Sequence, residues 1–231
     1  MKNKRFAAGR REFLQQSGAV MVSFSLAPGA FAQQPAPKPA PLPGSLNANR
    51  MLDSWLRINP DGTVTVFTGK AELGQGILTA LAQIAADELD VAYERIEMIS
   101  ADTSRSPNEG QTAGSQSVEQ SGAAIHYAAA EARDILLQLA AARLGVAADR
   151  VVVTDGTVTA GGAKTTYWEL ARNVNLKREA TARIKPKAPA RHQVIGKPVK
   201  RRDIPKKVMG GSAYVQDRKI ADMRGVSATL K

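Results

Sequence analysis

The chain has 231 residues and no cysteine, which excludes disulfide bonds, cysteine-ligated iron–sulfur clusters and cysteine-rich zinc sites on this polypeptide. Its formal charge of +11 is unevenly distributed: residues 1–32 carry +4, residues 33–169 carry −6 and residues 170–231 carry +13. The basic C-terminal part lacks the interleaved aromatic side chains that stack on bases, so we expect no nucleic-acid partner. We interpret it as a solvated or partner-facing strip.

Residues 1–32 are typical of an export signal. A basic start leads to Arg10-Arg11-Glu-Phe-Leu, a weakly apolar segment follows, and the stretch ends in Ala-Phe-Ala32. The apolar segment of about 15 residues is shorter than the roughly 20 that span a bilayer. We therefore expect periplasmic export by the twin-arginine (Tat) translocon, with cleavage after Ala32. That route carries folded proteins, which favours a cofactor loaded before transport.

Turn residues and apolar periodicity predict the first half of the fold. A proline-rich linker covers 33–50, and the alternation around Asn59–Gly62 predicts a hairpin over 56–67. A glycine-rich loop at 69–76 then leads into an amphipathic helix over 77–89. A strand over 95–100 and a polar loop over 101–117 follow.

A second helix is predicted over 116–144, ended by Gly145. Its expected buried stripe is Ile125, Ala128, Ala132, Ile135, Leu139 and Ala142. A hairpin with an Asp155-Gly156 turn and a short helix over 167–172, capped by Thr166, come next. The order predicts an α+β fold, a mixed sheet with packed helices. Residues 190–231 contain short strand-like pieces, so we expect the chain to stop before its last domain does.

Two loops combine glycine with hydroxyl and amide side chains directly before a helix. Gly74-Gln75-Gly76 precedes the first helix, and residues 109–117 precede the second. Because helix N-termini carry free N–H groups and a positive dipole end, the two could converge on one anionic ligand. The first loop is not a dinucleotide-binding fingerprint, since Thr79 replaces the third glycine. Alternatively, the first loop is a turn feeding a core helix, and Ser115 and Ser117 are helix caps.

Only two imidazoles are available as metal ligands. His126 and His192 are far apart in sequence, with no ligand pattern around them. We expect both to be ordinary surface or partner-contacting residues. Any metal must then arrive on an organic carrier.

The run from Gly69 to Leu89 resembles the glycine–glutamine loop and following helix of the molybdenum subunits of the xanthine dehydrogenase/aldehyde oxidase family. Asp102-Thr103 and Thr112 to Ser117 resemble that family's second cofactor loop, at a similar separation. Residues 195–217 resemble the beginning of its hammerhead α/β domain, which in most relatives precedes the two loops. The signal and this order are similar to the isoquinoline 1-oxidoreductase beta subunit and nicotinate dehydrogenase type.

The resemblance implies a molybdopterin cofactor carrying molybdenum, in the cytosine dinucleotide form. The implied cofactor-binding residues are Leu73, Gly74, Gln75, Gly76, Thr112, Gly114 and Ser115. The family's general-base glutamate has no counterpart in this sequence, so no catalytic residue is assigned. The predicted domains are the signal (1–32), the linker (33–50), a partial molybdopterin-binding domain (51–175), a basic linker (176–194) and the start of a hammerhead-like domain (195–231).

The resemblance further implies an exported hydroxylase or dehydrogenase that oxidises aldehydes or N-heterocycles with water as the oxygen source. Without cysteine the chain needs a small iron–sulfur subunit as partner, and export favours a cytochrome c acceptor over NAD. The remainder of the large subunit would be a further partner, so we expect no activity from the chain alone. Two other interpretations stay open: a non-catalytic exported binding or assembly module, and a truncated fragment.

Overall fold

The computed structural model describes residues 40–212, 214 and 217. The predicted signal (1–32), the first part of the linker (33–39) and the end of the predicted hammerhead-like domain lie outside these residues. From Pro41 onward the described chain forms one compact unit with α+β architecture. No helix of this part is long and apolar enough to cross a membrane.

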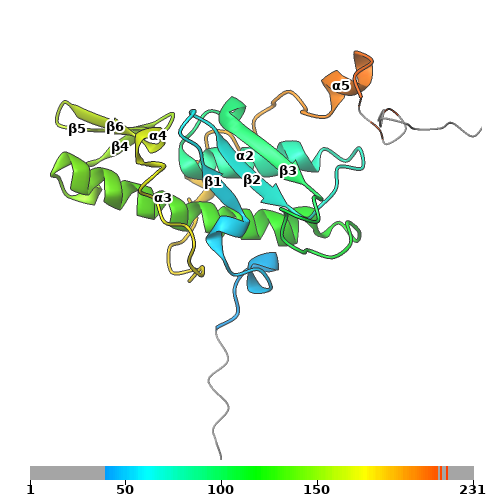
Figure 1. Cartoon of the computed structure of the whole chain (residues 1–231), viewed down its shortest axis with the longest axis horizontal. Coiled ribbons are helices and arrows are strands. Elements are labelled where there is room, and N and C mark those ends of the chain that lie inside the picture. The colour runs from blue at the N-terminus through cyan, green and yellow to red at the C-terminus, as the bar shows by residue number, and fades with distance from the viewer. Residues whose placement is uncertain (1–39, 213, 215–216, 218–231) are drawn as a thin grey trace, which may run out of the picture. The chain divides into compact units, whose positions relative to one another are not determined.

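The first sheet has three strands in the order β1-β2-β3 (Figure 1). β1 (Leu56–Ile58) and β2 (Val64–Thr68) form the predicted antiparallel hairpin, with Leu56 opposite Val66. β3 (Ile96–Ser100) lies parallel to β2, with Val64 opposite Ile96. All five residues of β2 are buried, as expected of a central strand covered on both faces.

The predicted first helix is confirmed. α2 (Ile77–Leu89) connects the parallel strands β2 and β3, which no hairpin turn could join. It begins after Gly76 and ends at Asp90, both with left-handed backbone, and packs Leu81, Ala85 and Leu89 into the core.

The second helix, α3 (Ala123–Leu144), runs along α2 and reaches a second sheet (Figure 1). Its first turn differs from the prediction, because Ser117–Gly122 forms a π-helical turn, η4. The left-handed Gly145 ends it as predicted. The predicted buried stripe is partly wrong: Ala142 is exposed, whereas Leu136 and Ala140 are fully buried.

The second sheet contains β4 (Val152–Thr154), β5 (Thr157–Ala160) and β6 (Ala163–Thr166), all antiparallel. The hairpin at Asp155-Gly156 is confirmed, but β6 was not predicted and the strands belong to two sheets. α4 (Tyr167–Leu170) is capped by the Thr166 hydroxyl, which accepts from the Glu169 N–H, as predicted.

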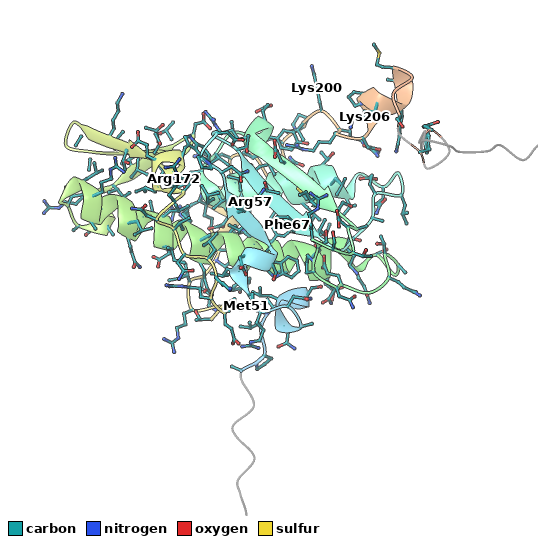
Figure 2. All side chains as sticks on the ribbon, viewed as in Figure 1. Met51, Arg57, Phe67, Arg172, Lys200 and Lys206 are labelled. Carbon is teal, nitrogen blue, oxygen red and sulfur yellow. The ribbon has the colours of Figure 1, made fainter. Side chains whose placement is uncertain are left out.

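The basic segment after residue 170 differs from a solvated strip. Met51 pairs with Glu179, and Ala180 donates its N–H to the Arg50 carbonyl. Lys187 is buried. Other basic side chains are exposed, as Figure 2 shows for Arg172, Lys200 and Lys206. The strand-like pieces predicted after residue 190 are wrong for residues 190–212, which contain the short helix α5 (Ile204–Val208) and no strand.

Candidate functional site

The two predicted ligand loops leave the same edge of the first sheet. Because β2 and β3 are adjacent and parallel, their C-terminal ends lie together. The first loop (residues 69–76) follows β2, and the second loop (residues 101–116) follows β3. The parallel pairing of β2 and β3 therefore brings the two loops together, although α2 and β3 separate them in the sequence.

The buried side chain of Lys70 connects the two loops. The residue is only 2% exposed, and its ammonium donates to the carbonyl oxygens of Glu109 (2.8 Å) and Gln111 (2.9 Å). The N–H of Ala71 donates to the Thr112 hydroxyl at 2.9 Å. The first loop thus holds the second mainly through backbone atoms, which fixes its path.

The Glu109 carboxylate forms a second connection between the loops. One oxygen accepts from the Thr68 hydroxyl (2.9 Å), the Gly69 N–H (2.7 Å) and the Ser121 hydroxyl (3.0 Å). At Gly69 the approach is so close that a Cβ atom would lie 2.3 Å from the Pro107 carbonyl oxygen. Only glycine fits at that contact.

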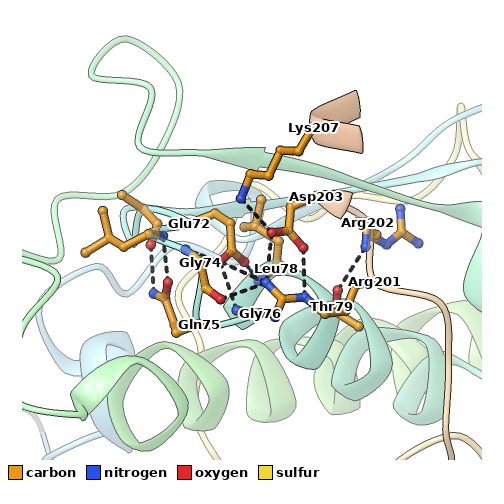
Figure 3. A network of polar contacts seen from close by, with 12 residues as sticks. Glu72, Gly74, Gln75, Gly76, Leu78, Thr79, Arg201, Arg202, Asp203 and Lys207 are labelled. Atoms are coloured by element: carbon orange, nitrogen blue, oxygen red, sulfur yellow. Dashed lines mark hydrogen bonds and ion pairs between the residues drawn. The ribbon is translucent and has the colours of Figure 1, made fainter. Parts of the chain in front are cut away.

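Glu72 organises the turn that leads into α2 (Figure 3). One carboxylate oxygen accepts from the N–H groups of Gly74 and Gly76, both at 2.8 Å, and the other accepts from Leu78 at 3.2 Å. Gly74 has φ +105° and Gly76 has φ +82°, values that side chains with a Cβ rarely adopt. The carboxylate therefore stabilises a turn that glycine makes possible.

The Gln75 side chain folds back on its own loop. Its amide nitrogen donates to the Ala71 carbonyl (3.0 Å), and its amide oxygen accepts from the Leu73 N–H (2.6 Å). Leu73 itself is 72% exposed. Gln75 thus stabilises the loop and leaves the large apolar side chain of Leu73 at its rim.

The two loops and the start of the following helices enclose an open cavity of about 440 Å³. Six of the seven predicted cofactor-binding residues line it, namely Leu73, Gln75, Gly76, Thr112, Gly114 and Ser115. Gly74 is the exception, since it lies in the turn but is not part of the lining. Apolar side chains of Ile77 and Val118 complete the wall. Within the described part of the chain, the Ser115 and Ser117 hydroxyls make no hydrogen bond and are available to a ligand.

Two details differ from the expected site. At the start of α2, the N–H groups of the N-cap residue Gly76 and of Leu78 already donate to Glu72, so an acidic side chain occupies part of this helix end. The second loop enters a π-helical turn, and no serine side chain caps it. The interpretation of Ser115 and Ser117 as caps is therefore wrong, whereas the convergence of the two helix N-termini on one anionic ligand stays a prediction. The cavity itself offers hydroxyl, amide and apolar groups.

Arg201 lies against the first loop, although it follows it by more than a hundred residues in sequence (Figure 3). Its guanidinium donates to the Gly74 carbonyl at 2.8 Å and to both Asp203 carboxylate oxygens, at 2.9 and 2.8 Å. The hydrogen bonds from Arg201, then that from Lys207, hold the pKa of Asp203 well below its ordinary range. The hydrogen bond to Asp203 in turn raises the pKa of both basic side chains.

The two histidines, which are distant in sequence, lie close together in the fold. Their ring centroids are 5.9 Å apart, and His126 Nε2 lies 3.1 Å from the fully buried carboxylate of Glu88. Arg133 also approaches this carboxylate, at 2.9 Å. His126 is thus a partner of a buried acid, which corrects its description as an ordinary surface residue. In the described part of the chain no group of three or more ligand side chains is placed to hold a metal ion.

The sequence did not reveal four residues that shape the site. Lys70, Glu109, Arg201 and Asp203 all read as ordinary charged residues, because burial and long-range pairing leave no local pattern. The only available signal was the position of Lys70 and Glu109 directly beside glycine-rich turns.

Comparisons with known proteins agree with this geometry. Residues 4–202 match the molybdopterin cofactor-binding domain family. A nicotinate dehydrogenase subunit from Pseudomonas putida is 37% identical over 75% of this chain and 15% of its own length. A membrane-bound aldehyde dehydrogenase (pyrroloquinoline-quinone) of Gluconacetobacter polyoxogenes is 30% identical over 96% of this chain and 29% of its own length.

The beta subunit of isoquinoline 1-oxidoreductase from Brevundimonas diminuta is 29% identical over 93% of this chain and 32% of its own length. The chain thus spans between 15% and 32% of the length of these three relatives. The family match covers most of the chain and includes both loops that form the cavity. The chain belongs to the molybdopterin cofactor-binding domain family.

Proposed function

We propose that this chain forms one wall of the molybdenum-cofactor site of an exported enzyme that oxidises aldehydes or N-heterocycles with water as the oxygen source. The observation that carries the proposal is the cavity between the two loops, lined by residues that the family resemblance marks as cofactor contacts. The relatives named for nicotinate, isoquinoline and aldehyde support the substrate class.

The cavity suits part of a pterin cofactor. Its volume lies within the range of ordinary ligand pockets, and its lining joins apolar surface to a few polar groups. Thr112, Gly114 and Ser115 would hold a polar ring edge, and Leu73 would cover its face. When bound, the molybdenum cofactor supplies the two-electron oxidation chemistry. This chain orients the cofactor and excludes water, and we assign it no catalytic residue.

We propose the cytosine dinucleotide form of the cofactor, which the resemblance to the isoquinoline 1-oxidoreductase and nicotinate dehydrogenase type implies. We propose a small iron–sulfur subunit as partner, because a chain without cysteine holds no cysteine-ligated cluster. A cytochrome c and the remaining part of a large subunit complete the proposed assembly. The names of two relatives, which are subunits, support this arrangement.

The test is the metal and pterin content of the full chain, purified alone and with its partner subunits. Stoichiometric molybdenum in the complex supports the proposal, whereas its absence from every preparation would refute it and leave the non-catalytic module and the truncated fragment. Ser115→Ala removes one hydroxyl from the cavity lining and should weaken cofactor retention by roughly fivefold. Thr154→Ala, at an exposed residue of β4 in the second sheet, serves as the control.

We further propose periplasmic export through the Tat pathway, on the basis of Arg10-Arg11 and the Ala-Phe-Ala32 site. Changing Arg10 and Arg11 to lysine keeps the charge but should block export. Cell fractionation with an antibody against the chain measures this. Undiminished protein in the periplasm would refute the twin-arginine assignment.

A further inference from the structure

Residues 187–203, here called the strap, lie along α2 from its C-terminal end to its N-terminal end. Backbone groups and a lysine side chain of the strap form hydrogen bonds with polar side chains of α2 and with its C-cap residue, Asp90. The hydrogen bonds are Lys187 N–H to Glu88 (2.8 Å), Lys187 Nζ to Asp90 (2.5 Å), the N–H groups of Gln193, Val194 and Ile195 to Asp87, Gln83 to the Val194 and Lys197 carbonyls, and Arg202 N–H to Thr79 (3.1 Å).

Asp87 is the central anchor of the strap. It is 3% exposed although it lies on a helix, and its carboxylate accepts from three consecutive N–H groups of the strap. A buried carboxylate without partners would be costly, so these hydrogen bonds make strap and helix mutually dependent. The strap is therefore built into the fold at this point.

Arg202 fixes the other end. Its guanidinium donates to the carbonyl oxygens of Ile96 (2.6 Å) and Tyr93 (2.5 Å), and it stacks 4.3 Å from the centre of the Tyr93 ring. With residue 202 held against the start of β3, its neighbour Arg201 is directed to the first loop.

Arg201 then lies against the turn of the first loop that contains Gly74 and Gly76. It donates to the Gly74 carbonyl and lies 3.8 Å from the Glu72 carboxylate that holds the turn. A Cβ atom on Gly76 would come within 3.4 Å of the Arg201 guanidinium carbon. The glycines give the backbone of this turn conformational freedom, and Arg201 restrains it from outside.

We infer that Arg201 is a positioning residue for the first loop, and that the strap sets the loop geometry that presents Leu73 and Gln75 to the cavity. This inference rests on the proposed function, because exact placement of the loop matters only if the loop holds a ligand. The planar guanidinium pairs with both Asp203 oxygens through two nitrogens and also donates to the Gly74 carbonyl, a fixed geometry that the single nitrogen of an ammonium does not reproduce. Arg201→Lys is therefore not conservative here.

Hydrogen–deuterium exchange of the full chain, without cofactor, tests the inference directly. Arg201→Ala should speed exchange in a peptide covering residues 71–78 by roughly fivefold to tenfold, with Arg201→Lys intermediate. Peptides from β2 and from the second sheet should be unchanged. The control is Lys200→Ala, which removes the same charge from an exposed neighbouring side chain (Figure 2). Unchanged exchange at 71–78, or an equal increase across the whole chain, would overturn the positioning role.

A second measurement links positioning to the cofactor. In the assembled complex, Arg201→Ala should lower molybdenum per chain severalfold, while Lys200→Ala should keep the wild-type content. Full molybdenum occupancy in Arg201→Ala would overturn the link between the strap and the site. If the wild-type complex itself holds no molybdenum, the proposed function fails, whereas the exchange result still decides what Arg201 does to the loop.

Discussion

Gly69→Ala tests the close approach of the two loops. The added methyl carbon would lie 2.3 Å from the Pro107 carbonyl oxygen, 3.0 Å from the Glu109 nitrogen and 3.1 Å from the Glu109 Cβ. These neighbours are mostly backbone, so the second loop must retreat by about 1 Å to restore ordinary contact distances. That movement also stretches the 2.7 Å hydrogen bond from the Gly69 N–H to the Glu109 carboxylate.

Overpacking of this kind costs about 1–3 kcal/mol, and weakening one hydrogen bond to a charged group adds about 1 kcal/mol. We therefore expect Gly69→Ala to lower the free energy of unfolding by about 2–4 kcal/mol and the melting temperature by roughly 5–15 °C. Urea unfolding and calorimetry of the full chain measure both quantities.

Gly122→Ala provides the matched control. Its Cβ would meet the end of the Ile84 side chain at 3.2 Å, a group that can move, and alanine is the better helix former. The free energy of unfolding should stay within about 1 kcal/mol of the wild-type value. If Gly69→Ala were as stable as this control, the loops would not be in the described contact, and the cavity built on that contact would be in question.

Three further substitutions test other contacts. The hydrogen bond from Arg95 lowers the pKa of the Asp155 carboxyl from its ordinary value of 3.8. The ion pair therefore stabilises the fold fully above pH 3.8, and this stabilisation is lost as the pH falls through the lowered pKa. Asp155→Asn should lower the free energy of unfolding by about 0.5–1 kcal/mol at pH 7, because both side chains are partly exposed. The melting temperatures of variant and wild type should begin to approach each other only below about pH 4 and should coincide below the lowered pKa. Glu72→Gln places an amide N–H against the Leu78 N–H and should lower the free energy of unfolding by about 1–2 kcal/mol. Urea unfolding measures this, and an unchanged midpoint would contradict the role of Glu72 in the turn. Lys187→Ala removes the ammonium that lies 2.5 Å from the Asp90 carboxylate and should lower the free energy of unfolding by about 2–4 kcal/mol. Trypsin should then cleave the strap faster than in the wild type. Wild-type resistance to trypsin would show that the strap does not depend on this lysine.

Local patterns predicted the local elements well. The helix at 77–89 has the predicted bounds because its apolar spacing agrees with glycine at its start, and the turns at Asn59–Gly62 and Asp155-Gly156 follow from short-range backbone chemistry. The buried stripe of α3 was less well predicted. Its alanine-rich sequence carries little periodic contrast, so the sheets and α2 decide which residues are covered.

The site was predicted in part. The two glycine-rich loops and their resemblance to a cofactor-binding family predicted seven cofactor-binding residues. Six of these residues line one cavity in the structure. The charged groups that hold the loops were not predicted, since Lys70, Glu109 and Arg201 act through partners more than thirty residues away in the chain. Long-range pairing leaves no trace in local composition.

The sequence by itself therefore determined the α+β elements, the two loops and the family of the chain. Only the tertiary structure decided that Glu72 occupies the N-terminal end of α2 and that the basic segment forms the strap. Helix periodicity and turn chemistry depend on neighbours a few residues apart and can be read directly. The burial of Asp87 and the reach of Arg201 depend on which surfaces meet after folding, and so they follow only from the folded chain.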